Sequence, residues 1–126
     1  MEEQRKEFYL FEHKPVTINV LGTEYKILEL SENEDDTLKE RELNGYFDGT
    51  IKRIALRTDY DVSAGAVGDI IRLKRKVLRH ELIHAYLYES GLSYQCHWAE
   101  NEEMVDWFAL QMPKLFNLFE KLNITK

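Results

Sequence analysis

The sequence predicts an α+β fold, in which a small antiparallel or mixed sheet from the N-terminal half packs on a long helix and on further C-terminal helices. Two observations support this prediction. Residues 16–57 contain short segments that alternate apolar and polar side chains, as half-buried strands do. Residues 68–122 carry apolar side chains at helical spacing and contain only one proline. The length of 126 residues fits one domain over residues 1–126.

The predicted strands form two pairs. Residues 16–20 and 24–30 alternate on either side of a Leu-Gly-Thr turn, which predicts a hairpin. A second pair, residues 44–47 and 50–56, turns at Asp48 and Gly49. The acidic segment between the pairs, residues 31–42, is expected to be an exposed loop or a short helix.

The helical half begins with a long helix over about residues 68–90, which Gly91 would end as a left-handed cap. One side of this helix combines apolar residues with two histidines at steps of three and four: Ile70, Leu73, Val77, His80, His84 and Leu87. A second helix is predicted over about residues 99–112. Pro113 is expected to stop it and to open a terminal helix over residues 113–122, because proline suits only the first helical turn.

Charge and composition exclude several classes of protein. The net charge of −6 argues against a broad nucleic-acid-binding face, so no nucleic-acid partner is expected. The basic run Arg72, Lys74, Arg75, Lys76 and Arg79 lies mostly off the histidine stripe and is expected to be a solvated outer face. The single cysteine, the charged N-terminus and the lack of an apolar span of about 20 residues predict a cytoplasmic protein without a membrane segment.

The residues His80, Glu81 and His84 form an H-E-x-x-H motif inside the predicted long helix. Histidines four residues apart lie one turn apart on one helix face, so both imidazoles can reach one metal ion. Glu81 is turned by about 100° from His80, so it can flank the metal and reach an attacking water without being a ligand. The motif therefore predicts a zinc site with Glu81 as the general base.

A catalytic zinc needs a third protein ligand and one open position. Glu102, Glu103 and His97 follow the motif at suitable distances. We favour Glu102, because it lies at the edge of the inward face of its helix, while Glu103 is turned about 100° further round. Asp106, one turn after Glu102, is placed to accept a hydrogen bond from a metal-bound histidine and to fix its tautomer.

An N-E-x-x-x-D pattern about twenty residues after H-E-x-x-H resembles the gluzincin arrangement of thermolysin-like peptidases, in which the glutamate binds zinc and the aspartate supports a histidine. Residues 50–113, and the run 102–113 above all, are similar to the ImmA/IrrE family, although Val105 stands where that family usually has alanine. These are small gluzincin-type peptidases, common on phages and mobile elements. The resemblance implies a minimal gluzincin-like metallopeptidase domain with one Zn²⁺ per chain.

The predicted function is hydrolysis of a peptide bond in a specific protein partner, with a phage or host regulator of the repressor type as the candidate that the resemblance suggests. Tyr86, Tyr94, His97 and Arg57 are candidates for stabilising the oxyanion, and the strand at residues 53–56 could pair with an extended substrate. One alternative is a catalytically silent binding module with a metallopeptidase fold. Another is a SprT-like peptidase that uses His97 as the third ligand.

Overall fold

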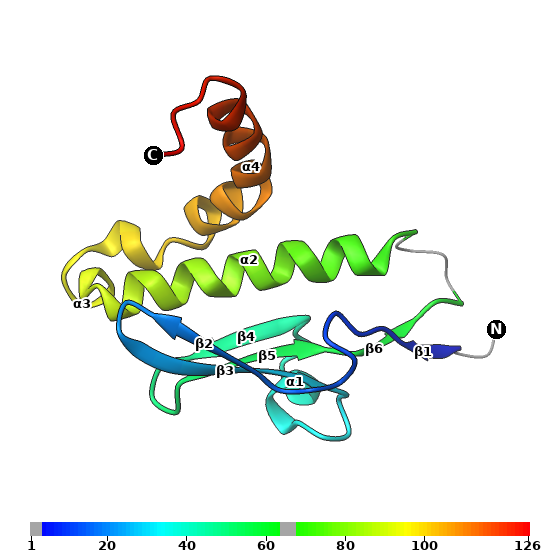
Figure 1. The fold of residues 1–126 in the computed structure, drawn as a ribbon. Coiled ribbons are helices and arrows are strands. Elements are labelled where there is room, and N and C mark those ends of the chain that lie inside the picture. The colour runs from blue at the N-terminus through cyan, green and yellow to red at the C-terminus, as the bar shows by residue number, and fades with distance from the viewer. Residues whose placement is uncertain (1–3, 64–67) are drawn as a thin grey trace.

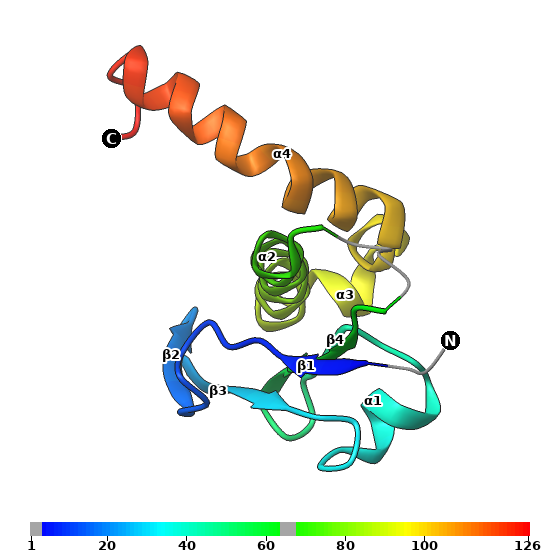
Figure 2. The ribbon, with the colours of Figure 1, turned by 90° about the vertical axis from the view of Figure 1, so that its right-hand side faces the viewer.

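The computed structural model describes residues 4–63 and 68–126, and its fold is α+β with a small mixed sheet and C-terminal helices. Helix α2 (Ile70–Glu89) lies across one face of the sheet, and helix α4 (Glu102–Lys121) crosses the opposite side of α2 (Figures 1 and 2). Between these helices lie the short helix α3 (Leu92–Gln95) and the 3-10 turn η1 (His97–Glu100). In the described part of the chain, no helix is long and apolar enough to cross a membrane.

The main sheet has four strands in the order β2-β3-β5-β4. The hairpin of β2 (Val16–Val20) and β3 (Thr23–Leu30) and the antiparallel pair of β4 (Gly45–Asp48) and β5 (Arg53–Arg57) both agree with the predicted pairs. Strand β5 runs parallel to β3, so the sheet is mixed and β4 lies at its edge.

The N-terminal half also contains elements that the alternation of apolar and polar residues does not predict. Strands β1 (Arg5–Glu7) and β6 (Asp59–Asp61) pair in a separate two-stranded sheet, which their charged sequence did not predict. The acidic segment 31–42 contains the short helix α1 (Asp36–Glu40), capped by the side chain of Asp35. Leu38 on this helix is fully buried, and of the two forms predicted for this segment, an exposed loop or a short helix, the structure has the short helix.

Helix α2 lies close to the edge strand β4 because two glycines leave room for it. A Cβ atom on Gly45 would lie 2.7 Å from Cγ1 of Val77, and one on Gly49 would lie 2.6 Å from the ring of Tyr88. Asp69 caps the start of α2 through its side chain, and Gly91 follows the C-cap with a φ of 83°, as predicted. The helix that carries the histidines is thereby fixed against the sheet edge.

Helix α4 is continuous through Pro113, so the prediction that this proline separates two helices is wrong. A proline inside a helix leaves the carbonyl four residues earlier without its N–H partner. Here that carbonyl belongs to Ala109, and Nε of Arg79 donates a hydrogen bond to it at 2.6 Å. A side chain of α2 therefore supplies the hydrogen bond that the proline cannot.

The basic run on α2 is not a uniform solvated face, which corrects a second prediction. Arg72 and Arg75 are exposed, but Lys74 is buried and forms an ion pair of 3.0 Å with the buried Glu29. Lys74 also donates to the carbonyl of Phe8 at 2.6 Å. The buried residues of α2 are Ile70, Lys74, Glu81 and Ala85, which lie along one side of the helix. This side is buried more deeply than the side that carries the two histidines.

We expect Lys74→Met to lower the free energy of unfolding by about 3 kcal/mol, because it leaves the Glu29 carboxylate buried without its cation. Arg75→Met, at the exposed neighbouring position, should change it by less than about 0.5 kcal/mol. Urea unfolding of both variants measures the difference. Equal losses from the two substitutions would contradict a structural role for the buried pair.

Glu89, the last residue of α2, ties this helix to the first hairpin. Its carboxylate accepts hydrogen bonds from Thr23 (2.9 Å) and Tyr25 (2.5 Å) and forms an ion pair with Lys52 (2.8 Å). These contacts, led by the hydrogen bond from Lys52, lower the pKa of Glu89 to about 2.

A carboxyl group whose pKa is lower in the folded state stabilises the fold above its unfolded pKa, and this stability is lost as the pH falls through the folded pKa. The free-energy difference between the parent and Glu89→Gln should therefore be full at neutral pH and shrink between about pH 4.5 and pH 2. Urea unfolding across this range measures it. A difference that stays constant with pH would contradict this account.

Candidate metal centre

Helix α2 presents His80 and His84 on the same side, one turn apart. Their Nε2 atoms are 3.2 Å apart, and both side chains are largely buried. Burial lowers the pKa of His84, which favours the neutral imidazole with a free lone pair. The two nitrogens therefore face one common point, as the motif predicts.

Glu102, the first residue of α4, faces both histidines. Its Oε2 atom lies 2.9 Å from Nε2 of His80, and its Oε1 atom lies 2.8 Å from Nε2 of His84. The N-cap Asn101, whose side chain accepts a hydrogen bond from the Met104 amide, starts the helix at this position. Within residues 4–63 and 68–126, neither Glu103 nor His97 has a hydrogen bond to either histidine.

Asp106 supports His80 from the far side of the ring. Its Oδ1 atom lies 3.3 Å from Nδ1 of His80, so this nitrogen donates to the carboxylate, which leaves Nε2 to bind a proton or a metal ion. Lys76 holds the same carboxylate at 3.0 and 3.2 Å, and its hydrogen bond is the largest cause of the lowered pKa of Asp106. The sequence analysis missed Lys76 as part of the site, although its place one turn before His80 was a signal.

Glu81 lies beside the histidines but is turned toward the sheet. It is 8 % exposed, and one oxygen of it lies within 4.8 Å of the ring nitrogens of His80 and His84. Burial raises the pKa of Glu81 to about 7, with a smaller contribution from Glu102, while His80 opposes the change. A carboxyl group of this kind can accept and return a proton near neutral pH.

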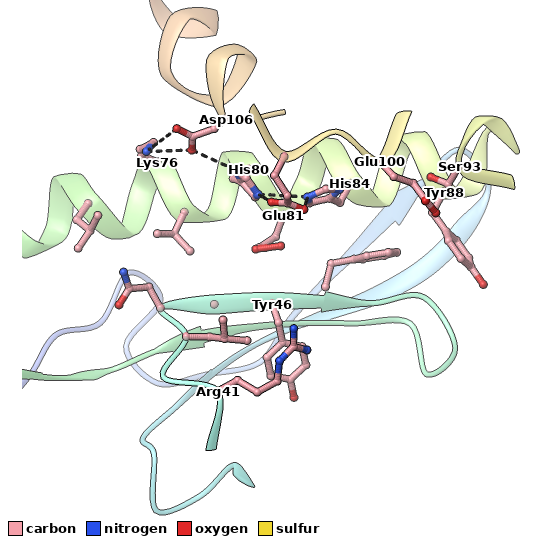
Figure 3. Close-up of a pocket in the computed structure, with 17 residues that line it drawn as sticks. Arg41, Tyr46, Lys76, His80, Glu81, His84, Tyr88, Ser93, Glu100 and Asp106 are labelled. Carbon is pink, nitrogen blue, oxygen red and sulfur yellow. Dashed lines mark hydrogen bonds and ion pairs between the residues drawn. The ribbon is translucent and has the colours of Figure 1, made fainter. Parts of the chain in front are cut away.

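These side chains open into a cleft of about 630 Å³ between α2 and the edge strand β4 (Figure 3). The structure places Tyr86, Tyr94, His97 and Arg57 outside its lining. Tyr86 lies two residues after His84 and is turned to another side of α2, and Tyr94 and His97 are exposed. Polar groups that do line it beyond the histidine cluster include Arg41, Tyr46, Tyr88, Ser93 and Glu100.

The strand that borders the cleft is β4 and not β5. Strand β5 has neighbours on both sides, so the prediction that residues 53–56 accept a substrate strand is corrected. The Arg57 amide donates to the carbonyl of Asn44, which fixes the hydrogen-bonding register of the β4–β5 ladder. In an antiparallel pair the ladder bonds alternate along the strand, so the N–H and C=O groups of Gly45 and Phe47 point to the free edge.

The candidate ligand atoms lie close enough together to share one ion. Ligands of a tetrahedral zinc at bonds of about 2.0–2.1 Å lie about 3.3 Å apart, and the distances here are somewhat shorter, at 2.8–3.2 Å. With Nδ1 of His80 donating to Asp106, the lone pair of its Nε2 faces a carboxylate oxygen, and such a contact needs a proton or a cation between the two atoms. Two imidazoles and a carboxylate are a common zinc donor set, so His80, His84 and Glu102 could hold this ion.

Comparisons with protein-family models, with curated proteins and with solved structures found no match. What the site can do chemically follows from its own residues.

Proposed function

We propose that this protein is a zinc-dependent peptidase that hydrolyses a peptide bond in an extended segment of a protein partner. The observation that carries the proposal is the convergence of Nε2 of His80, Nε2 of His84 and the Glu102 carboxylate within 2.8–3.2 Å. The buried Glu81 beside them and the cleft along a free sheet edge support it. The resemblance to the ImmA/IrrE family favours the same reaction class, with a repressor-type regulator as the candidate substrate.

When bound, Zn²⁺ supplies Lewis-acid chemistry, which acidifies water and polarises a carbonyl group. His80, His84 and Glu102 hold the ion, and Asp106 keeps Nδ1 of His80 protonated. The Glu81 carboxylate takes a proton from the attacking water and returns it to the nitrogen of the leaving amine. In the metal-free chain, burial raises the pKa of this carboxyl to about 7, and a bound cation would favour its ionised, proton-accepting form.

The substrate backbone binds by strand addition to β4. The outward N–H and C=O groups of Gly45 and Phe47 pair with an extended segment, which then runs between the strand and α2 and past Glu81. Lining the same cleft, Arg41 and Glu100 offer opposite charges to substrate side chains. The SprT-like alternative is disfavoured, because among the described residues His97 has no hydrogen bond to His80 or His84 and does not line the cleft.

The test is metal analysis together with cleavage of a degenerate peptide library by the full chain. We expect about one zinc per chain, product peptides detected by mass spectrometry, and loss of cleavage on chelation with recovery on adding zinc. Glu103→Gln, which alters the neighbouring acid without touching the histidines, should behave like the parent. Full cleavage by metal-free protein, or a chain that binds no divalent metal, would overturn the proposal.

Lys76 gives this site a positioning residue that acts through Asp106. We expect Lys76→Met to weaken zinc binding about tenfold, because Asp106 loses its second anchor and holds His80 less firmly. Lys76→Arg should restore most of the affinity, and Arg75→Met, one residue away and exposed, should leave it unchanged. Competition with a chromogenic chelator measures all three, and equal affinity for Lys76→Met and the parent would reject the role.

A further inference from the structure

We infer that the extended segment bound along β4 carries an aspartate or glutamate opposite Tyr46, and that Arg41 selects this acidic residue. Because this segment is the substrate in the proposed reaction, the inference rests on the proposed function. It names the chemistry of one substrate side chain, which lies next to the bond that is cut and on the opposite side of β4 from the metal centre.

The metal centre lies level with the middle of β4, at Tyr46. Gly45 lies beside Val77 of α2, and the ring of Phe47 stacks on that of His84 with centroids 6.5 Å apart. The rest of the H-E-x-x-H motif lies between these two contacts along the helix. The bond attacked in a segment bound along β4 is therefore level with Tyr46, and the substrate residue opposite Tyr46 flanks this bond.

The side chains of β4 alternate between the two sides of the sheet. Gly45 and Phe47 face α2, so Tyr46 points to the opposite side, where its hydroxyl donates to Asp35 at 2.6 Å. Residues directly opposite each other on neighbouring strands point to the same side. The substrate residue opposite Tyr46 therefore directs its side chain away from the metal centre, toward the side of the sheet on which α1 lies (Figure 2).

Arg41 offers a cation on that side of the cleft. It follows directly after α1 and lines the cleft together with Tyr46, on the opposite side of β4 from the histidines (Figure 3). Within residues 4–63 and 68–126, its exposed side chain forms no hydrogen bond or ion pair. Lys76 also lines the cleft, but Asp106 holds its ammonium group at 3.0 Å. Arg41 is therefore available to an anionic group of the substrate.

The position of Arg41 favours a side-chain carboxylate over the free C-terminus of a substrate. A guanidinium group binds a carboxylate through two parallel hydrogen bonds. A terminal carboxylate would continue the line of the backbone along the edge of β4, whereas Arg41 lies to one side of this line, where a side chain reaches (Figure 3). The neighbours Glu40 and Glu42 do not line the cleft, so they leave this position to the substrate.

The first experiment is cleavage of a degenerate library of peptides with blocked termini by the zinc-loaded full chain. Mass spectrometry of the products should show aspartate or glutamate at one fixed position next to the cut. Arg41→Gln should lower kcat/KM for one such peptide roughly tenfold or more, the effect of losing one charge-assisted contact. Arg41→Glu should replace the acidic preference by a preference for lysine or arginine.

Arg75→Glu is the matched control, since it reverses the charge of an exposed arginine that does not line the cleft. It should keep the preference of the parent. Zinc content and melting temperature should stay unchanged in all three variants, because the replaced side chains are exposed. Cleavage by the parent without an acidic preference, or the same preference in Arg41→Glu, would overturn the inference and leave the proposed function intact.

The second experiment separates recognition from cleavage. The same library is passed over immobilised, zinc-loaded Glu81→Gln, and the retained peptides are sequenced. We expect peptides with an acidic residue at one position, and basic ones in its place when Arg41→Glu is added. This result with a parent that cuts nothing would support selection by Arg41 and reject only the peptidase. Retention that Arg41→Glu does not change would overturn the inference.

Discussion

Replacing Glu81 with glutamine is expected to reduce peptide cleavage by about 10²–10⁴-fold, the usual contribution of a general base. Glutamine keeps the size and hydrogen-bonding shape of the side chain but cannot accept a proton from water. The residue is buried beside the histidines without being their hydrogen-bond partner, so zinc content and melting temperature should stay close to those of the parent. Initial rates on one identified peptide, normalised to bound zinc, measure the effect.

Glu103→Gln is the matched control, since it neutralises an exposed carboxylate near the site that does not line the cleft. It should retain cleavage within a few-fold. If Glu81→Gln cleaves as fast as Glu103→Gln, Glu81 is not the base. If the parent binds zinc and a protein partner but cleaves nothing, and Glu81→Gln is equally effective, the chain is a binding module that keeps a metallopeptidase site.

Replacing Glu102 with alanine is expected to weaken zinc binding by well over 100-fold, more than the 10–100-fold typical of a residue that only supports a ligand. Its two oxygens lie 2.8 and 2.9 Å from the histidine nitrogens, and within the described residues no other carboxylate forms an ion pair or hydrogen bond with both rings. The side chain is 70 % exposed, so its removal should cost little folding stability in the metal-free state. Chelator competition gives the affinity, and thermal melting with and without zinc gives the linked stabilisation.

Glu103→Ala provides the comparison, because it removes the same charge from the same helical turn. It should bind zinc as the parent does. Should the two alanine variants have equal affinity, the carboxylate of α4 is not a ligand, and the donor set would have to be sought elsewhere. Cleavage should fail in Glu102→Ala at low zinc and return in part when zinc is raised, which separates lost affinity from lost chemistry.

The sequence predicted the features that depend on local spacing. Alternation over residues 16–30 and 44–56 predicted both strand pairs, and the step of four from His80 to His84 put the imidazoles on one side of α2. The angular positions of Glu102 and Glu103 on the helix were enough to predict that Glu102 is the one that faces the histidines. These features follow from periods of two and 3.6 residues, which do not depend on what lies across the fold.

The sequence failed where a distant partner decides the outcome. Pro113 stays inside a helix because Arg79, 34 positions earlier in the chain, bonds the orphaned carbonyl. Lys74 is buried because Glu29 and the carbonyl of Phe8 meet its ammonium group. The cleft borders β4 because β5 lies between β3 and β4 and leaves β4 at the edge of the sheet. The periodicity of the sequence does not predict this strand order. Each failure is a tertiary contact that overrides a local preference.

The unbroken passage of α4 through Pro113 links two parts of the molecule mechanically. The helix is about 30 Å long, its first residue is Glu102, and its far end lies beyond the rest of the fold. Near the middle of the helix, Nε of Arg79 donates a hydrogen bond to the carbonyl of Ala109. Because the helix is continuous, its far end and the Glu102 carboxylate belong to one element. The position of this carboxylate therefore depends on how the whole helix is held, and not on its first turn alone.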